Sequence, residues 1–152
     1  MAALNASSTG ERVSLDRVRE RRNALRVTLQ TLEDANAAPA GTRWRERMAA
    51  ALDHAAVMLA AHITETEGPE GFFEELVRHE PRVHQHVDVL REEHVELQRE
   101  LARLIERCTT SSCGAAEMRD DVTELMAVLH HHRQAGADLL YEAYEVDVAS
   151  GD

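Results

Sequence analysis

The sequence is most distinctive in what it lacks. It contains no lysine, only 3 prolines and 7 glycines, and its aromatic content is 3%. The shortage of aromatics argues against a β-sandwich or barrel, where such residues pack the sheets. The low glycine and proline content excludes a collagen-like or low-complexity chain. Alanine, leucine, glutamate and arginine dominate instead, and all four favour helices. At 152 residues, the sequence therefore predicts one all-α domain.

The excess of acidic over basic residues argues against several classes of partner. The formal net charge is −11, so the chain lacks the positive surface that nucleic acids and anionic membranes require. No apolar stretch approaches the roughly 20 residues of a membrane span. The first residues, MAALNASSTGER, show no basic region followed by an apolar run, which a secretory signal would have. We therefore expect a soluble cytoplasmic protein with no nucleic-acid or membrane partner.

Cysteine is also scarce. Cys108 and Cys113 are separated by the segment TTSS. In a reducing compartment both are expected to be thiols, one of them a small apolar residue at a helix end. A redox pair is the alternative, although the spacing differs from C-x-x-C.

Apolar residues recur at helical spacing in four segments, at about 12–35, 42–67, 81–107 and 115–148. Thr42 is a plausible N-cap for the second segment. Gly68 and Pro69 interrupt that segment, and a further helical piece at 72–77 ends before Pro81. Four amphipathic helices with short connections predict an up-down-up-down antiparallel four-helix bundle. The expected organisation is a flexible N-terminus at 1–10 followed by the bundle at 11–148.

Three of the nine histidines fall on the apolar stripes of these helices. His94 lies between Leu90 and Leu97 in the third helix, and His62 and His132 take core positions in the second and fourth. At about 1.5 Å of rise per residue, the three lie within about 5 Å of one level along the bundle. A single buried histidine is usually a core residue with a hydrogen-bond partner. Three at one level predict a metal site, because neutral imidazole is a common ligand of iron, zinc and copper.

Carboxylates follow two of these histidines along the chain. Glu67 lies shortly after His62, and Asp138 and Glu142 lie after His132. Mixed nitrogen and oxygen ligands with open positions suit iron or manganese. Each acid taken alone could equally lie on a solvated helix face. Besides the three histidines, the candidate ligands from position alone are Glu65, Glu67, Asp138 and Glu142.

With these residues the chain resembles the hemerythrin-like family of His-His-Glu cation-binding bundles. The resemblance rests on HITETEGP from His62, the pair Glu93-His94, and HRQAGADLLYEAY from His132. It implies a non-haem centre with two irons, although one metal is an alternative. By position, the resemblance matches His62 with Glu67, a third-helix His94, and His132 with Asp138. With Glu142 added, the expected metal ligands are His62, Glu67, His94, His132, Asp138 and Glu142. The family usually has a first-helix histidine, which is missing here, and Leu90 replaces a third-helix histidine. A second metal would need other ligands, such as Glu142, Glu65, Asp16 or Glu20.

Three functions follow as alternatives. The first is an oxidoreductase that activates O2 or peroxide and acts on an unknown small molecule, with Tyr141 and Tyr144 beside the site. The second is a non-catalytic module that binds or senses O2, NO or iron. The third is a metal-free bundle that forms a homodimer through Phe72 and Phe73.

Overall fold

The computed structural model describes residues 4–41, 43–110 and 114–150, and gives only the backbone for 4–16, 18, 19, 21, 22 and 145–150. Within these residues the chain is all-helical and contains no strand. The four long helices are α1 (Leu4–Ala37), α2 (Trp44–Glu67), α4 (His84–Thr110) and α5 (Ala115–Ser150). Between α2 and α4 lie the short helix α3 (Phe72–His79) and a 3-10 turn, η1 (Pro81–Val83). The predicted all-α class and the four long helices are confirmed.

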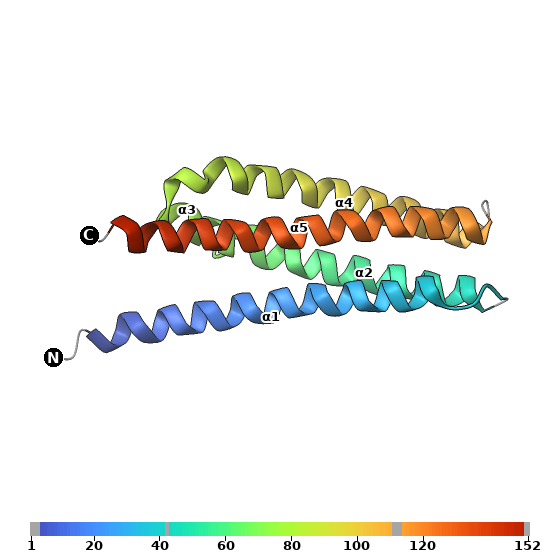
Figure 1. Ribbon diagram of the computed structural model, residues 1–152, viewed down its shortest axis with the longest axis horizontal. Helices are drawn as coiled ribbons and strands as arrows, with labels where there is room; N and C mark the ends of the chain where they lie inside the picture. The colour runs from blue at the N-terminus through green and yellow to red at the C-terminus, as the bar shows by residue number, and fades with distance from the viewer. Residues whose placement is uncertain (1–3, 42, 111–113, 151–152) are drawn as a thin grey trace.

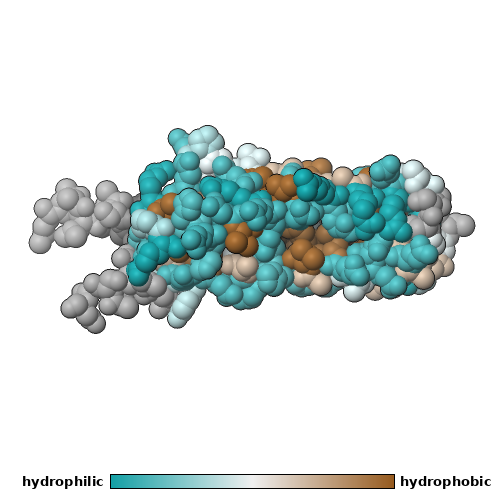
Figure 2. All heavy atoms as spheres, turned by 90° about the horizontal axis from the view of Figure 1, so that it is seen from above, coloured by the Kyte–Doolittle hydropathy of each residue, from teal (hydrophilic) through white to brown (hydrophobic). Residues whose placement is uncertain are grey.

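The long helices lie side by side along the length of the molecule (Figure 1). Contacts join α1 to α2, α2 to α4, α4 to α5, and α5 back to α1, so each long helix packs against two others. In Figure 1 successive long helices start at opposite ends of the molecule, and α3 lies at the end where α1 begins. Figure 2 shows one face covered mostly by hydrophilic side chains, with hydrophobic patches between them, as amphipathic helices would give.

The observed helix ends agree with those predicted from the glycine and proline residues that interrupt helices. α2 ends at Glu67, where the N–H of Gly68 donates to the carbonyl of Thr64, and α3 stops before Pro81. α1 begins at Leu4, ahead of the predicted start near residue 12. The expected N-cap Thr42 lies outside the described residues.

Gly71 fixes the turn between α2 and α3. A Cβ atom at this position would lie 2.6 Å from the carbonyl oxygen of Thr66 and 2.7 Å from that of Gly68. Both neighbours are backbone atoms, so the clash cannot be relieved by rotating a side chain. The chain can therefore make this turn, and begin α3 where it does, because the residue has no side chain.

Two apolar clusters fill the interior. The larger joins α1, α2, α4 and α5 through leucines and methionines that include Met48, Leu52, Leu101 and Leu125. The smaller cluster lies around α3 and includes Phe73, Leu76, Val87 and Leu139. Among the described residues, none of the helices combines the length and apolarity that a membrane crossing requires.

Candidate metal centre

Three histidines from three different helices converge in the interior. His62 comes from α2, His94 from α4 and His132 from α5, and one ring nitrogen of each lies within 4.8 Å of the others. The His94 and His132 ring centroids are 4.7 Å apart, and His62 lies 5.1 Å from His94 and 5.7 Å from His132. The structure therefore brings together the three histidines that the apolar stripes singled out. We call this group the histidine trio.

The trio forms a polar layer between the two apolar clusters. Leu97 and Leu129 belong to the larger cluster, while Leu90 and Leu139 belong to the smaller one. His94 and His132 lie between these leucines along α4 and α5, and are only 1% and 3% exposed. Burying a polar ring costs free energy, and the cost grows for every ring nitrogen that has no hydrogen-bond partner.

His132 is held at both ring nitrogens. Its Nδ1 lies 2.6 Å from Oε2 of Glu93, and its Nε2 lies 3.0 Å from Nε2 of His94. A carboxylate can only accept, so Nδ1 of His132 carries the hydrogen and its Nε2 presents a lone pair. This tautomer is inferred from the hydrogen-bond network. The lone pair is what a metal ion would need.

His94 is neutral in this site. Burial first, and then the neighbouring His132 and His62, together lower its pKa from 6.5 to about 3. A buried imidazole that resists protonation is ready to bind a cation. Nδ1 of His94 makes no hydrogen bond and lies 3.4 Å from Oε2 of Glu67.

The separation between the two Nε2 atoms fits a shared ion. Nitrogens bound at about 2.1 Å from one metal are about 3.0 Å apart at right angles and about 3.4 Å apart at the tetrahedral angle. The observed separation is 3.0 Å. Three imidazoles and no acid make up the group, so the residues present fit one transition-metal ion better than two.

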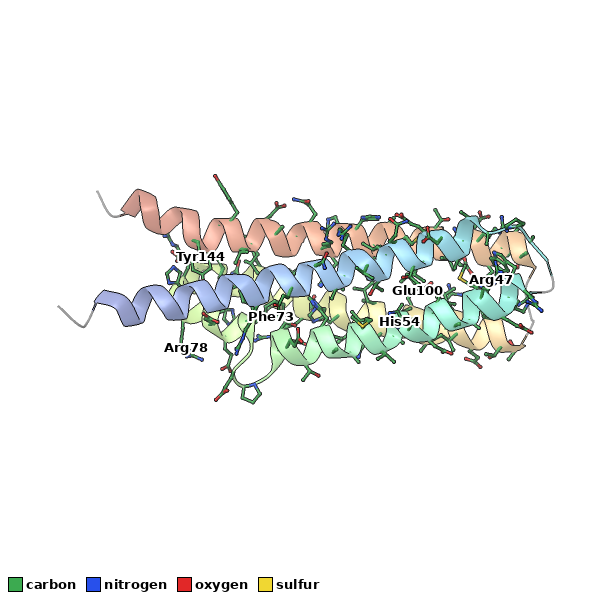
Figure 3. The ribbon with its side chains drawn as sticks, turned by 90° about the horizontal axis from the view of Figure 1, so that it is seen from below. Arg47, His54, Phe73, Arg78, Glu100 and Tyr144 are labelled. Carbon is green, nitrogen blue, oxygen red and sulfur yellow. The ribbon has the colours of Figure 1, made fainter. Side chains whose placement is uncertain are left out.

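Phe73 forms one wall of the site. Its ring stacks on His94, with centroids 5.7 Å apart and planes 12° from parallel. Arg91 lies over the same phenylalanine, 5.8 Å from the ring centroid. Figure 3 shows Phe73 inside the bundle, whereas Arg78 of the same short helix points outward. Because Phe73 is buried against its own chain, it is not available to a second copy.

The structure does not bring the two predicted acids of α5 to the trio. Asp138 is exposed, and its Oδ1 accepts from Nε2 of Gln134 at 2.9 Å. Glu142 instead pairs with exposed His86, at 3.0 Å between Oε2 and Nδ1. At 100° per residue, Asp138 is rotated about 120° around the helix from His132, which explains its outward position. Glu67 is the predicted acid that does lie beside the trio.

The other predicted contributors lie elsewhere. Tyr141 is 67% exposed, and Tyr144 stacks on His79, with ring centroids 4.7 Å apart. Glu20 is exposed, and the side chain of Asp16 lies outside the described residues. The six histidines that fall off the apolar stripes are all exposed: His54, His79, His84, His86, His130 and His131. Cys108 is buried, with its Sγ 3.4 Å from the carbonyl oxygen of Arg45, and Cys113 lies outside the described residues.

A small pocket borders the trio on the side of α1. It holds about 50 Å³ and is lined by Ala24, Leu25, Met58, Ala61, His62 and Glu65. A water molecule needs about 10–15 Å³ of such volume, so the pocket has room only for water-sized or diatomic molecules.

Glu93 is the residue that sequence reasoning missed. It lies next to His94 in α4, but its partner is His132, which is 39 residues away in the chain. The sequence alone could have indicated the position of Glu93 in part. A carboxylate one position from an inward histidine lies about 100° around the helix, where it faces a neighbouring helix.

Comparison with known proteins does not identify the chain, because no family model, no curated protein and no solved structure matches it significantly. The hemerythrin-like resemblance therefore stays a prediction.

Proposed function

We propose that the chain is a metal-binding, up-down-up-down antiparallel four-helix bundle of hemerythrin-like type, in which His62, His94 and His132 hold a non-haem iron ion. Its proposed activity is oxidation chemistry with O2 or peroxide. The observation that carries the proposal is the convergence of three imidazoles in the interior. The helix contacts and the alternating directions in Figure 1 support the bundle arrangement.

The chain's own residues would prepare the site for a cation. The low pKa of His94 keeps its ring neutral throughout the physiological pH range. Phe73 and the leucines on either side bury the rings of His94 and His132 and keep bulk water from them. Iron held there would supply redox chemistry with O2 or peroxide, as non-haem centres do.

The pocket beside His62 favours a small reactant over a bulky one. Its volume of about 50 Å³ suits a diatomic molecule or peroxide, but not a larger organic substrate. This observation also favours the second candidate function, a module that binds or senses O2 or NO. The two functions differ in turnover and can be separated by experiment.

Metal content is the first test. Protein prepared without an affinity tag should contain bound metal by elemental analysis. The variants His62→Ala, His94→Ala and His132→Ala should each lose most of it while keeping their helical circular dichroism. As a matched control, exposed His54→Ala should keep its metal. A tag-free protein that binds no iron, zinc or cobalt would contradict the proposal.

Reactivity is the second test. Anaerobic protein loaded with Fe(II) should consume O2 or peroxide beyond one equivalent. Consumption that stops at one equivalent excludes the oxidoreductase. An oxygenated spectrum that bleaches on deoxygenation would then establish the binding module instead.

A further inference from the structure

We propose that Glu67 and Glu93 are positioning residues that never touch the metal. They orient His94 and His132 so that both rings present Nε2 to a single ion. This role rests on the proposed metal site. It differs from the ligand role that the sequence predicted for Glu67, and it adds Glu93, to which the sequence analysis gave no role at the metal.

The four side chains form one continuous row. Glu67 of α2 lies 3.4 Å from Nδ1 of His94, the two Nε2 atoms are 3.0 Å apart, and Nδ1 of His132 lies 2.6 Å from Glu93. The two carboxylates therefore lie at the outer ends and the two Nε2 atoms face each other in the middle. Metal-binding histidines commonly have their second nitrogen held by a carboxylate in this way.

Distance keeps Glu93 away from an ion at the centre. The two nitrogens of an imidazole point to opposite sides of the ring, so a carboxylate bound to Nδ1 lies more than about 6 Å from a metal on Nε2. At 2.6 Å, the contact with His132 is as short as hydrogen bonds to ionised acceptors are. Glu93 can thus fix the His132 tautomer without entering the coordination sphere.

Glu67 has the corresponding position at the other end. It is the last residue of α2, and its Oε1 lies 3.9 Å from Nε of Arg91, which holds the carboxylate beside the site. In the metal-free arrangement His94 donates from Nε2 to His132, which leaves its Nδ1 without a hydrogen bond. A cation held by His94 and His132 would take the place of that hydrogen. His94 then carries its hydrogen on Nδ1, where Glu67 accepts it, and the ring stays neutral.

The charges also suit one ion. Three neutral imidazoles leave a divalent cation with its full charge, and two carboxylates close to the rings balance it from outside. Charge balance through the histidines raises their basicity and strengthens metal binding. A second ion would need carboxylate ligands, and this arrangement already uses both acids.

The test is titration of the metal-free protein with Co(II) and with Zn(II), followed by visible absorption and calorimetry. Wild type should bind one ion per chain. Glu93→Ala and Glu67→Ala should bind one ion with about 10–100-fold lower affinity. Glu93→Gln should lose less affinity than Glu93→Ala, because its amide oxygen can still accept from Nδ1. Glu92→Gln is the matched control, since this exposed neighbour should leave the affinity unchanged.

A second readout tests positioning directly. Nitrogen-15 NMR of the histidine rings should show His132 with its hydrogen on Nδ1 in wild type, with and without Zn(II). In Glu93→Ala the metal-free ring should become a mixture of both tautomers, while the helical circular dichroism is kept. A purely structural role for Glu93 would change stability without changing the tautomer.

The outcomes separate the two proposals. If wild type binds neither metal, the proposed function fails, and this role with it. If wild type binds one ion and Glu93→Ala binds it equally well, the positioning role alone is overturned. Two ions per chain in wild type, falling to one in the glutamate variants, would make the carboxylates ligands and would also overturn it.

Discussion

Two regions of the interior, the larger apolar cluster and the histidine trio at its border, differ in the side chains that they bury. The larger cluster is built of leucines, methionines and alanines with the buried Trp44 and Cys108, and joins all four long helices. At its border with the smaller cluster around α3, three histidines take core positions. An all-apolar cluster gains free energy from every buried side chain, whereas a buried histidine layer requires compensating hydrogen bonds. The comparison indicates that the larger cluster supplies stability, while the histidine layer at its edge costs stability and could hold a metal ion.

The largest expected loss of stability therefore comes from a substitution in the larger apolar cluster. Leu101 is 1% exposed in the larger cluster, and Leu101→Ala should lower the free energy of unfolding by about 2–5 kcal/mol. Chemical denaturation of the metal-free protein measures this change. The variant should still bind one equivalent of Zn(II). Loss of metal binding with the fold intact would show that metal binding at the trio depends on packing in the larger apolar cluster.

Metal binding at the histidine trio should change the stability by a smaller amount, and in the opposite direction. An ion that binds only the folded state, at 100 times its dissociation constant, should add about 2.7 kcal/mol to the free energy of unfolding. Thermal unfolding of wild type with and without Zn(II) should show this gain. His94→Leu should show none, since it removes the central ligand of the trio. An equal gain in the variant would place the stabilising ion elsewhere.

Lowering the pH should reduce the free energy of unfolding of the metal-free protein, because His94 is neutral in the folded state. Its pKa is about 3 in the folded state against 6.5 ordinarily, so the unfolded chain binds more protons between these values. Stability is therefore fully present above pH 6.5 and is lost as the pH falls towards 3. The loss should reach about 1.4 kcal/mol per pH unit from this one group. Denaturation at a series of pH values should give a shallower slope for His94→Leu than for wild type. The exposed control His54→Leu should keep the wild-type slope.

The smallest effect is expected at the acids that the structure leaves outside the site. Asp138→Asn combined with Glu142→Gln should change the free energy of unfolding by no more than about 0.5 kcal/mol. The affinity for Zn(II) should stay within about twofold of wild type, because both side chains lie on the exposed side of α5. A tenfold weaker affinity would instead indicate that one of these acids binds the metal.

Sequence reasoning succeeded where a short-range rule was enough. Gly68, Pro69 and Pro81 marked the helix breaks, and the spacing of Leu90, His94 and Leu97 placed His94 in the core. It failed where contacts join distant residues. Asp138 was assigned by proximity to His132 in the sequence, although six positions along a helix lead to a different face. The partnership of Glu93 with His132 depends on how α4 and α5 are rotated against each other, which no pattern within one helix reports.

The glycine turn after α2 has a consequence for the histidine trio. Since Gly71 leaves no room for a Cβ atom, it fixes where α3 begins, and α3 carries the phenylalanine that stacks on His94. A substitution at Gly71 would shift that ring although it alters no histidine and no carboxylate. A residue with no side chain of its own therefore helps to set the position of Phe73 against His94.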